Sequence, residues 1–134
     1  MNGGPAGLSP QPPRVLLIAS SAVERGARHQ ALTGAGFDVE TAQTATEAVE
    51  WLARRPYAAI VTDGYVPDMP PLDWLAALRG VATTTPLVVY VESSRQEEPG
   101  GHAAEFRAAA VLAPPVSPAQ LVEAVRAALG PAAG

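Results

Sequence analysis

The sequence predicts an α/β protein in which a parallel sheet is covered by helices on both faces. Two observations support this prediction. Five short strand-like runs, most of them apolar and bounded by turn-forming residues, are typical of strands that are buried on both faces. Each run is followed by a segment with helical spacing or a helix-capping pattern, so strands and helices alternate along the chain.

The first strand–helix unit begins with the apolar run at residues 15–19. A helix is expected over residues 22–33, with Val23, Ala27 and Leu32 as its core contacts. Glycines follow at once, and glycine readily takes the left-handed conformation that ends a helix.

The second unit begins with a short strand over residues 37–42. Thr44 and Glu47 have the spacing of a capping box, so they are expected to open the next helix. Pro56 ends that helix, because the residue before a proline avoids helical dihedral angles.

The third unit begins with the central strand, residues 58–62, which leads directly to a carboxylate at Asp63. Prolines, which helices tolerate in their first turn, precede the third helix. Its apolar stripe is expected at Leu72, Leu75 and Leu78.

The last two units occupy the C-terminal part of the chain. Strands are predicted over residues 87–91 and 111–113, with a short helix between them over residues 102–109. Ser117 and Gln120 have capping-box spacing, with a proline at the first helical position, so a final helix is expected to begin there.

Five such units in alternation imply a doubly wound parallel sheet with right-handed crossovers. The flavodoxin-like (βα)5 arrangement, with strand order 2-1-3-4-5, fits a chain of 134 residues. One domain is expected over residues 14–130, with a flexible segment over residues 1–13 before it and a tail over residues 131–134 after it.

Composition argues against several classes of function. The net charge is −4 and no basic run is present, which argues against nucleic-acid binding. The absence of cysteine excludes disulfides and thiolate metal sites. No apolar run approaches the roughly 20 residues that a membrane span needs, and the first residues do not have the pattern of a signal peptide. We therefore expect a cytoplasmic protein.

Asp63 follows the central strand, at the edge where open α/β sheets place their binding sites. Three residues separate it from Pro67. This spacing resembles the phosphoacceptor segment of response-regulator receiver domains, and the order of elements over residues 14–129 agrees with that family. The resemblance implies that Asp63 would accept a phosphoryl group in two-component, phosphorelay signalling of the bacterial type.

The resemblance also implies helper residues, most of which this sequence lacks. The family has two acidic residues at the end of its first strand, where this chain has Ala19 and Ser20. It has a lysine followed by a proline after its fifth strand, where this chain has Pro114 and Pro115. All nine basic residues of the chain are arginine, so no lysine elsewhere can replace the missing one.

Two further positions of the family site are altered. The family's hydroxyl residue corresponds to Val91 when positions are counted from Pro86, and to Ser93 when they are counted from Asp63. The family's switch aromatic corresponds to Val111. Because phosphoryl transfer depends on cations and Mg²⁺ prefers carboxylate ligands, we expect a degenerate site with no cofactor and at most weak Mg²⁺ binding.

Three hypotheses follow. The favoured one is an atypical receiver that acts as a protein-interaction module and not as an enzyme. The second is a functional phosphoacceptor at Asp63, and the third is a flavodoxin-like small-molecule binder. Asp63 also has a purely structural interpretation, in which it caps a turn. Asp68 and Asp73 are expected to be solvated carboxylates and not metal ligands.

The expected partners are signalling proteins, with a histidine kinase or an output protein as the candidates, and neither nucleic acid nor a membrane. They would bind a surface such as the face formed by residues 102–109, 111–113 and 117–129. A homodimer is left open.

Overall fold

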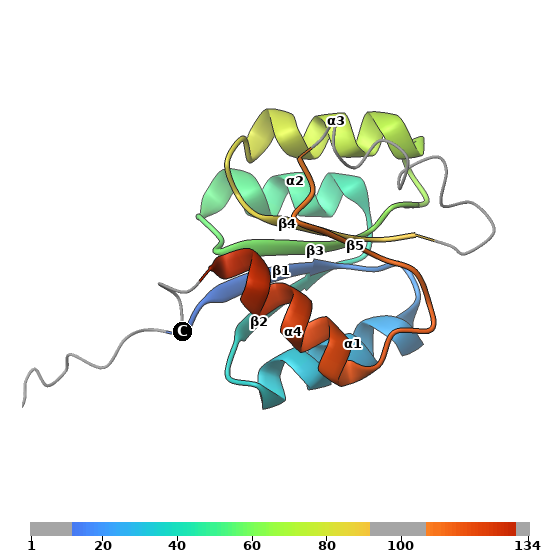
Figure 1. Ribbon diagram of the computed structural model, residues 1–134. Coiled ribbons are helices and arrows are strands. Elements are labelled where there is room, and N and C mark those ends of the chain that lie inside the picture. The colour runs from blue at the N-terminus through green and yellow to red at the C-terminus, as the bar shows by residue number, and fades with distance from the viewer. Residues whose placement is uncertain (1–11, 92–106, 131–134) are drawn as a thin grey trace, which may run out of the picture.

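Five parallel strands form the sheet at the centre of the computed structural model, which describes residues 12–91 and 107–130 (Figure 1). The strands are β1 (Arg14–Ile18), β2 (Asp38–Ala42), β3 (Ala59–Asp63), β4 (Leu87–Tyr90) and β5 (Ala110–Leu112). Their order across the sheet is β2-β1-β3-β4-β5, and each neighbouring pair is parallel. The predicted fold class and strand order are therefore confirmed.

Helices cover both faces of this sheet (Figure 1). One face carries α1 (Ala22–Gly34) and α4 (Pro118–Leu129), and the other carries α2 (Ala45–Arg54) and α3 (Pro71–Val81). Among the described residues, none of the helices has the length and apolar character that crossing a membrane requires.

The sheet divides the core into two halves, because successive side chains of a strand point to opposite faces. Leu17 of β1 and Val61 of β3 pack toward α1 and α4. Leu16 and Ile60 pack toward α2 and α3. All four side chains are wholly buried, which explains the continuous apolar runs of these strands.

The helix predicted over residues 102–109 is wrong where the structure describes it, because residues 107–109 form no helix. Arg107 has a φ of 57°, outside the right-handed helical region, and β5 begins at Ala110. The rest of that segment lies outside the described residues, as do the predicted tail and all but two residues of the predicted flexible segment.

The two capping patterns give different results. Ser117 and Gln120 form the complete capping box of α4, with hydrogen bonds of 3.1 and 2.7 Å. At α2, Thr44 caps the backbone N–H of Glu47 at 3.1 Å, as predicted. The Glu47 carboxylate, however, accepts from the backbone N–H of Gln43, one residue earlier than a capping box requires.

Helix α1 turns a different face to the core than its apolar spacing predicts. Val23 is 82% exposed and Ala27 is also exposed, so both are wrong as core contacts, whereas Leu32 is buried as predicted. Arg25 and Arg28 lie on the same helical stripe as Leu32. Their long side chains reach polar groups at the end of the sheet, and this requirement sets the rotation of the helix.

Helix α3 is anchored by three buried side chains. Leu75 and Leu78 are buried as predicted, but Leu72 is 39% exposed and is wrong as a member of the core stripe. Trp74 is wholly buried in its place. The bulk of the indole next to β3 accounts for this shift of the buried face.

Asp68 is an exposed loop carboxylate, as expected, but it also has a structural role as a helix cap. Its side chain lies at the N-terminus of α2, where it accepts hydrogen bonds from the backbone N–H groups of Ala45 at 2.8 Å and Thr46 at 3.0 Å. The Thr46 hydroxyl donates to it as well, at 2.9 Å. An anion in this position satisfies helix N–H groups that have no partner inside the helix. The loop after β3 is thereby tied to α2.

Trp74 ties α3 to the end of β3. Its indole Nε1–H donates to Thr62 Oγ1 at 3.0 Å and to the backbone carbonyl of Asp63 at 3.3 Å. The hydroxyl of Thr62, which is wholly buried, donates to the same carbonyl at 2.8 Å. Because a buried polar group without a partner is costly, these bonds fix the last residue of the strand.

We predict that Trp74→Phe lowers the free energy of unfolding by about 1–3 kcal/mol, because it removes the donor that the buried hydroxyl of Thr62 accepts from. Urea denaturation monitored by circular dichroism measures this change. Trp51→Phe is the matched control, since Trp51 lies half-buried on α2. Equal losses in the two variants would show that ring size, and not the buried hydrogen bond, causes the effect.

We also predict that the stability of Asp68→Asn falls less steeply than that of the wild type as the pH is lowered. Hydrogen bonds from Ala45 and Thr46 hold the pKa of the Asp68 carboxyl below its ordinary value. Its stabilising contribution is therefore present above the ordinary pKa and is lost as the pH falls through the folded-state pKa. Thermal unfolding between neutral and strongly acidic pH tests this, and an acid-side slope as steep as that of the wild type would contradict it.

Candidate functional site

Asp63 is the last residue of β3, and its side chain lies at the carboxyl edge of the sheet. It is 18% exposed and lines an open pocket of about 300 Å³. Ser20, Glu24, Tyr90 and Pro114 line the same pocket. The carboxylate is thus largely removed from water but still reachable from solvent, at the edge where this class of sheet places its sites.

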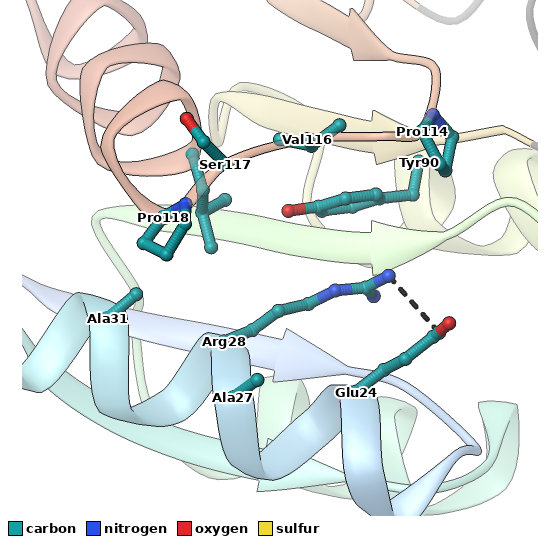
Figure 2. A pocket seen from close by; sticks show the side chains of 10 residues that line it. Glu24, Ala27, Arg28, Ala31, Tyr90, Pro114, Val116, Ser117 and Pro118 are labelled. Atoms are coloured by element: carbon teal, nitrogen blue, oxygen red, sulfur yellow. Dashed lines mark hydrogen bonds and ion pairs between the residues drawn. The ribbon is translucent and has the colours of Figure 1, made fainter.

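Arg28 of α1 provides a cation for this carboxylate. Its Nη1 lies 2.7 Å from Asp63 Oδ1, and its Nη2 lies 3.2 Å from Glu24 Oε1, one turn earlier on the same helix. The guanidinium also lies against the ring of Tyr90, 3.6 Å from its centroid (Figure 2). Only 11% of the Arg28 side chain is exposed. The ion pair with Asp63 and the face of the Tyr90 ring stabilise the guanidinium in this largely buried position.

A second arginine of α1 binds the backbone of the loop between β1 and α1. Arg25 Nη1 donates to the backbone carbonyls of Ala19 at 2.8 Å and Ser20 at 3.3 Å. These two residues connect β1 to α1. Two guanidinium groups therefore cover the carboxyl edge of β1 and β3, where the family pattern has acidic side chains.

The protonation of Asp63 reflects opposing effects. Burial raises the pKa of its carboxyl above the ordinary value, and the charge of Glu24 acts in the same direction. The hydrogen bond and charge of Arg28 lower the pKa, as does a hydrogen bond from the backbone of Ser20. Arg28 is therefore the main group that favours the ionised form of Asp63.

The structure brings some of the site residues named from the sequence together with Asp63. Ser20 and Pro114 line its pocket. Ala19 is wholly buried directly after β1, where its backbone N–H bonds to the carbonyl of Ala42 at 3.1 Å. Pro115, which follows a cis peptide bond, lies away from Asp63 and lines a different pocket beside β5.

Among the described residues, no hydroxyl side chain stands at the position where the family has its serine or threonine. Val91 comes directly after β4 and lines the Asp63 pocket, but it has an aliphatic side chain. Ser93, the alternative, lies outside the described residues. The residue that faces Asp63 across the strand pair is Tyr90.

Lysine is absent from the family position, as the sequence indicates, but Arg28 of α1 provides a cation at Asp63 that the sequence did not lead us to expect. One signal was present in the sequence. Glu24 and Arg28 are four residues apart, on the helix that directly follows the strand next to β3.

The residues present do not fit a Mg²⁺ ion of the kind that the family uses. Mg²⁺ needs oxygen ligands, and Asp63 Oδ1 already accepts from a guanidinium. Ala19 and Ser20 offer no carboxylate, and their carbonyls accept from Arg25. Over residues 12–91 and 107–130, no group of three or more histidine, aspartate or glutamate side chains is placed to hold a metal ion.

We predict that Arg28→Gln raises the pKa of Asp63 further and that Glu24→Gln lowers it, because the two side chains act on the carboxyl with opposite charge. Where the folded pKa exceeds the unfolded one, stability falls as the pH rises between the two values. Arg28→Gln should widen that interval and Glu24→Gln should narrow it. Carbon NMR titration of the Asp63 carboxyl measures both, and equal pKa values in the two variants would contradict the geometry.

Comparison with known proteins supports the resemblance seen in the sequence. A family model described as the response regulator receiver domain matches residues 15–126. A search of curated proteins found no match. Solved structures, in contrast, include many with the same fold.

Three of these structures illustrate the range of similar proteins. The chemotaxis response regulator CheY4 of Vibrio cholerae is 23% identical with a TM-score of 0.77, over 87% of this chain and 98% of that one. A CheY-like receiver domain protein from Methanospirillum hungatei JF-1 is 21% identical with a TM-score of 0.80, over 88% and 94%. An adenylate cyclase from Rhodopirellula baltica is 17% identical with a TM-score of 0.80, over 88% and 87%.

At these identities the structural matches show the fold alone, and the family follows from the match that covers most of the chain. That match spans β1 through most of α4 and includes Asp63 at the end of β3. The chain belongs to the response-regulator receiver domain family.

Proposed function

We propose that this chain is an atypical receiver of two-component signalling, which acts mainly as a protein-interaction module and not as an enzyme. Its state would not be set mainly by phosphorylation of Asp63. The observation that carries this proposal is the ion pair of 2.7 Å between Arg28 and Asp63. It stands in a crevice where Ala19 and Ser20 occupy the positions of the family's acidic residues.

The ion pair matters because of what phosphoryl transfer to a carboxylate requires. One carboxylate oxygen must approach phosphorus, while cations neutralise the charge on the phosphoryl oxygens. In this site Oδ1 is already engaged in a short, charge-assisted hydrogen bond. Releasing it would leave a largely buried carboxylate without its partner, which is strongly unfavourable. The donor set also does not fit the metal that the family relies on.

The proposed partners are other signalling proteins, either a histidine kinase or an output protein, and we place the chain in the cytoplasm. Part of the surface expected to bind them consists of β5 and α4. Val111 on β5 is 38% exposed there, which offers an apolar contact at the edge of the sheet. A second copy of the chain is the alternative occupant, and sedimentation of the purified protein distinguishes the two.

A functional phosphoacceptor is the second candidate, and Arg28 is the observation that favours it. If the guanidinium moved from Asp63 to the incoming phosphoryl group, it could take over the charge stabilisation that the missing lysine provides in the family. The Asp63 oxygen would then attack phosphorus of a phosphohistidine. The P–N bond would break, its electron pair would stay on the histidine nitrogen, which would take a proton from water, and an acyl phosphate would form on Asp63.

The decisive experiment treats the full chain with a small phosphoryl donor such as acetyl phosphate in the presence of Mg²⁺, followed by intact-mass measurement. Beryllofluoride, followed by amide NMR, is the second probe. We expect neither reagent to change the wild-type protein, because Asp63 is paired with Arg28 and lacks a metal site. A mass increase of one phosphoryl group that is absent from Asp63→Asn would establish the second candidate.

Partner binding gives an independent measure of the favoured proposal. Asp63→Asn keeps the shape of the side chain but cannot be phosphorylated. We expect it to bind a histidine kinase or output protein of the same host within about threefold of the wild-type affinity, a difference of less than 1 kcal/mol. The proposal would be overturned if the wild type bound the partner only after phosphorylation and Asp63→Asn did not bind it.

A further inference from the structure

The guanidinium of Arg28 is enclosed by three groups. Asp63 and Glu24 accept from its two terminal nitrogens. Figure 2 shows the contact with Glu24 and the ring of Tyr90 against the face of the guanidinium. The aliphatic part of the side chain enters this position from α1, beside Ala27 (Figure 2). A single positive charge thus sits between two carboxylates at the edge of the sheet.

We propose that Arg28 is a resident counter-ion that excludes divalent cations from Asp63. The inference rests on the proposed function and deepens it, because it names the group that keeps the crevice free of metal. In this view the missing acidic residues are only part of the reason why the site does not take Mg²⁺. The other part is that a cation supplied by the chain itself already neutralises the carboxylate.

Electrostatics supports this role for an arginine in particular. A guanidinium keeps its proton under all ordinary conditions, so it cannot become neutral to admit a second cation. Two positive charges a few ångströms apart repel strongly in a site that is mostly removed from water. Moving the side chain away would break the bond to Asp63 and the contact with Tyr90 at the same time.

Without Arg28, the carboxylates of Asp63 and Glu24 would remain as oxygen ligands at this edge of the sheet. Asp63 and Glu24 both contact one guanidinium, through its two different terminal nitrogens, so the two carboxylates flank the position that its charge occupies. Carboxylate oxygens with water completing the coordination are the ligands that Mg²⁺ and Mn²⁺ accept. The neighbouring carbonyls of Ala19 and Ser20 are engaged by Arg25 and would contribute little. Removing the guanidinium should therefore create a weak site for a divalent cation.

Paramagnetic broadening by Mn²⁺ tests the proposal on the full, isotope-labelled chain. The amide of Gly64, which follows Asp63, is the reporter. In the wild type we expect no selective broadening at Gly64 at millimolar Mn²⁺. In Arg28→Gln we expect selective broadening, with an apparent affinity on the order of tenfold or more above that of the wild type, because the repelling charge is gone.

Arg28→Gln/Asp63→Asn is the matched control and should lose the broadening that Arg28→Gln gains. Arg28→Met, which keeps an apolar stem beside Tyr90, serves if the glutamine variant does not fold. Selective broadening of the Gly64 amide in the wild type would overturn the proposal. A folded Arg28 variant that shows no more broadening than the wild type would overturn it as well. If both variants fail to fold, the wild-type spectrum decides: selective broadening refutes exclusion, and its absence supports it.

These outcomes are distinct from failure of the proposed function. Phosphorylation of the wild-type chain would overturn the proposed function whatever the Mn²⁺ spectra show. If the Arg28 variant shows no Mn²⁺ broadening and the wild type does not react with acetyl phosphate, only the proposal that Arg28 excludes divalent cations is overturned. The two experiments use different reagents and different readouts, so one cannot be mistaken for the other.

Discussion

A carboxylate at the end of a strand that is buried on both faces must be neutralised, and much of this molecule's local architecture follows from that constraint. Asp63 continues β3 out of the core, and burial alone would favour its neutral form. Arg28 relieves this cost, and it can do so only if α1 turns its basic residues toward the sheet. The exposure of Val23 on the opposite face of the same helix follows from that rotation.

Three helices together fix the end of β3. The indole of Trp74 on α3 and the hydroxyl of Thr62 bind the backbone carbonyl of Asp63. Asp68 connects the following loop to α2, and Arg28 approaches from α1. The family fold supplies the scaffold, but these contacts decide what the site can do.

The sequence predicted the sheet because strands buried on both faces leave continuous apolar runs, and it predicted the start of α4 because a capping box is a local pattern. It did not predict the buried face of α1. Apolar periodicity treats arginine as solvated, whereas Arg28 is 11% exposed and takes a place that Ala27 was expected to fill. Its partner is 35 residues away, so no local pattern reveals the contact. Leu72 was misjudged for a similar reason, since the buried indole of Trp74 displaces the stripe.

Trp74 has a consequence of a different kind. A wholly buried indole that donates to the backbone carbonyl of Asp63 is an intrinsic fluorophore at the end of the strand that carries this carboxylate. Indole emission responds to the local electric field, and Trp51, which is only half-buried, is the one of the two tryptophans that soluble quenchers reach more readily. The molecule therefore carries its own optical probe of the crevice, and events there can be followed in the unlabelled chain.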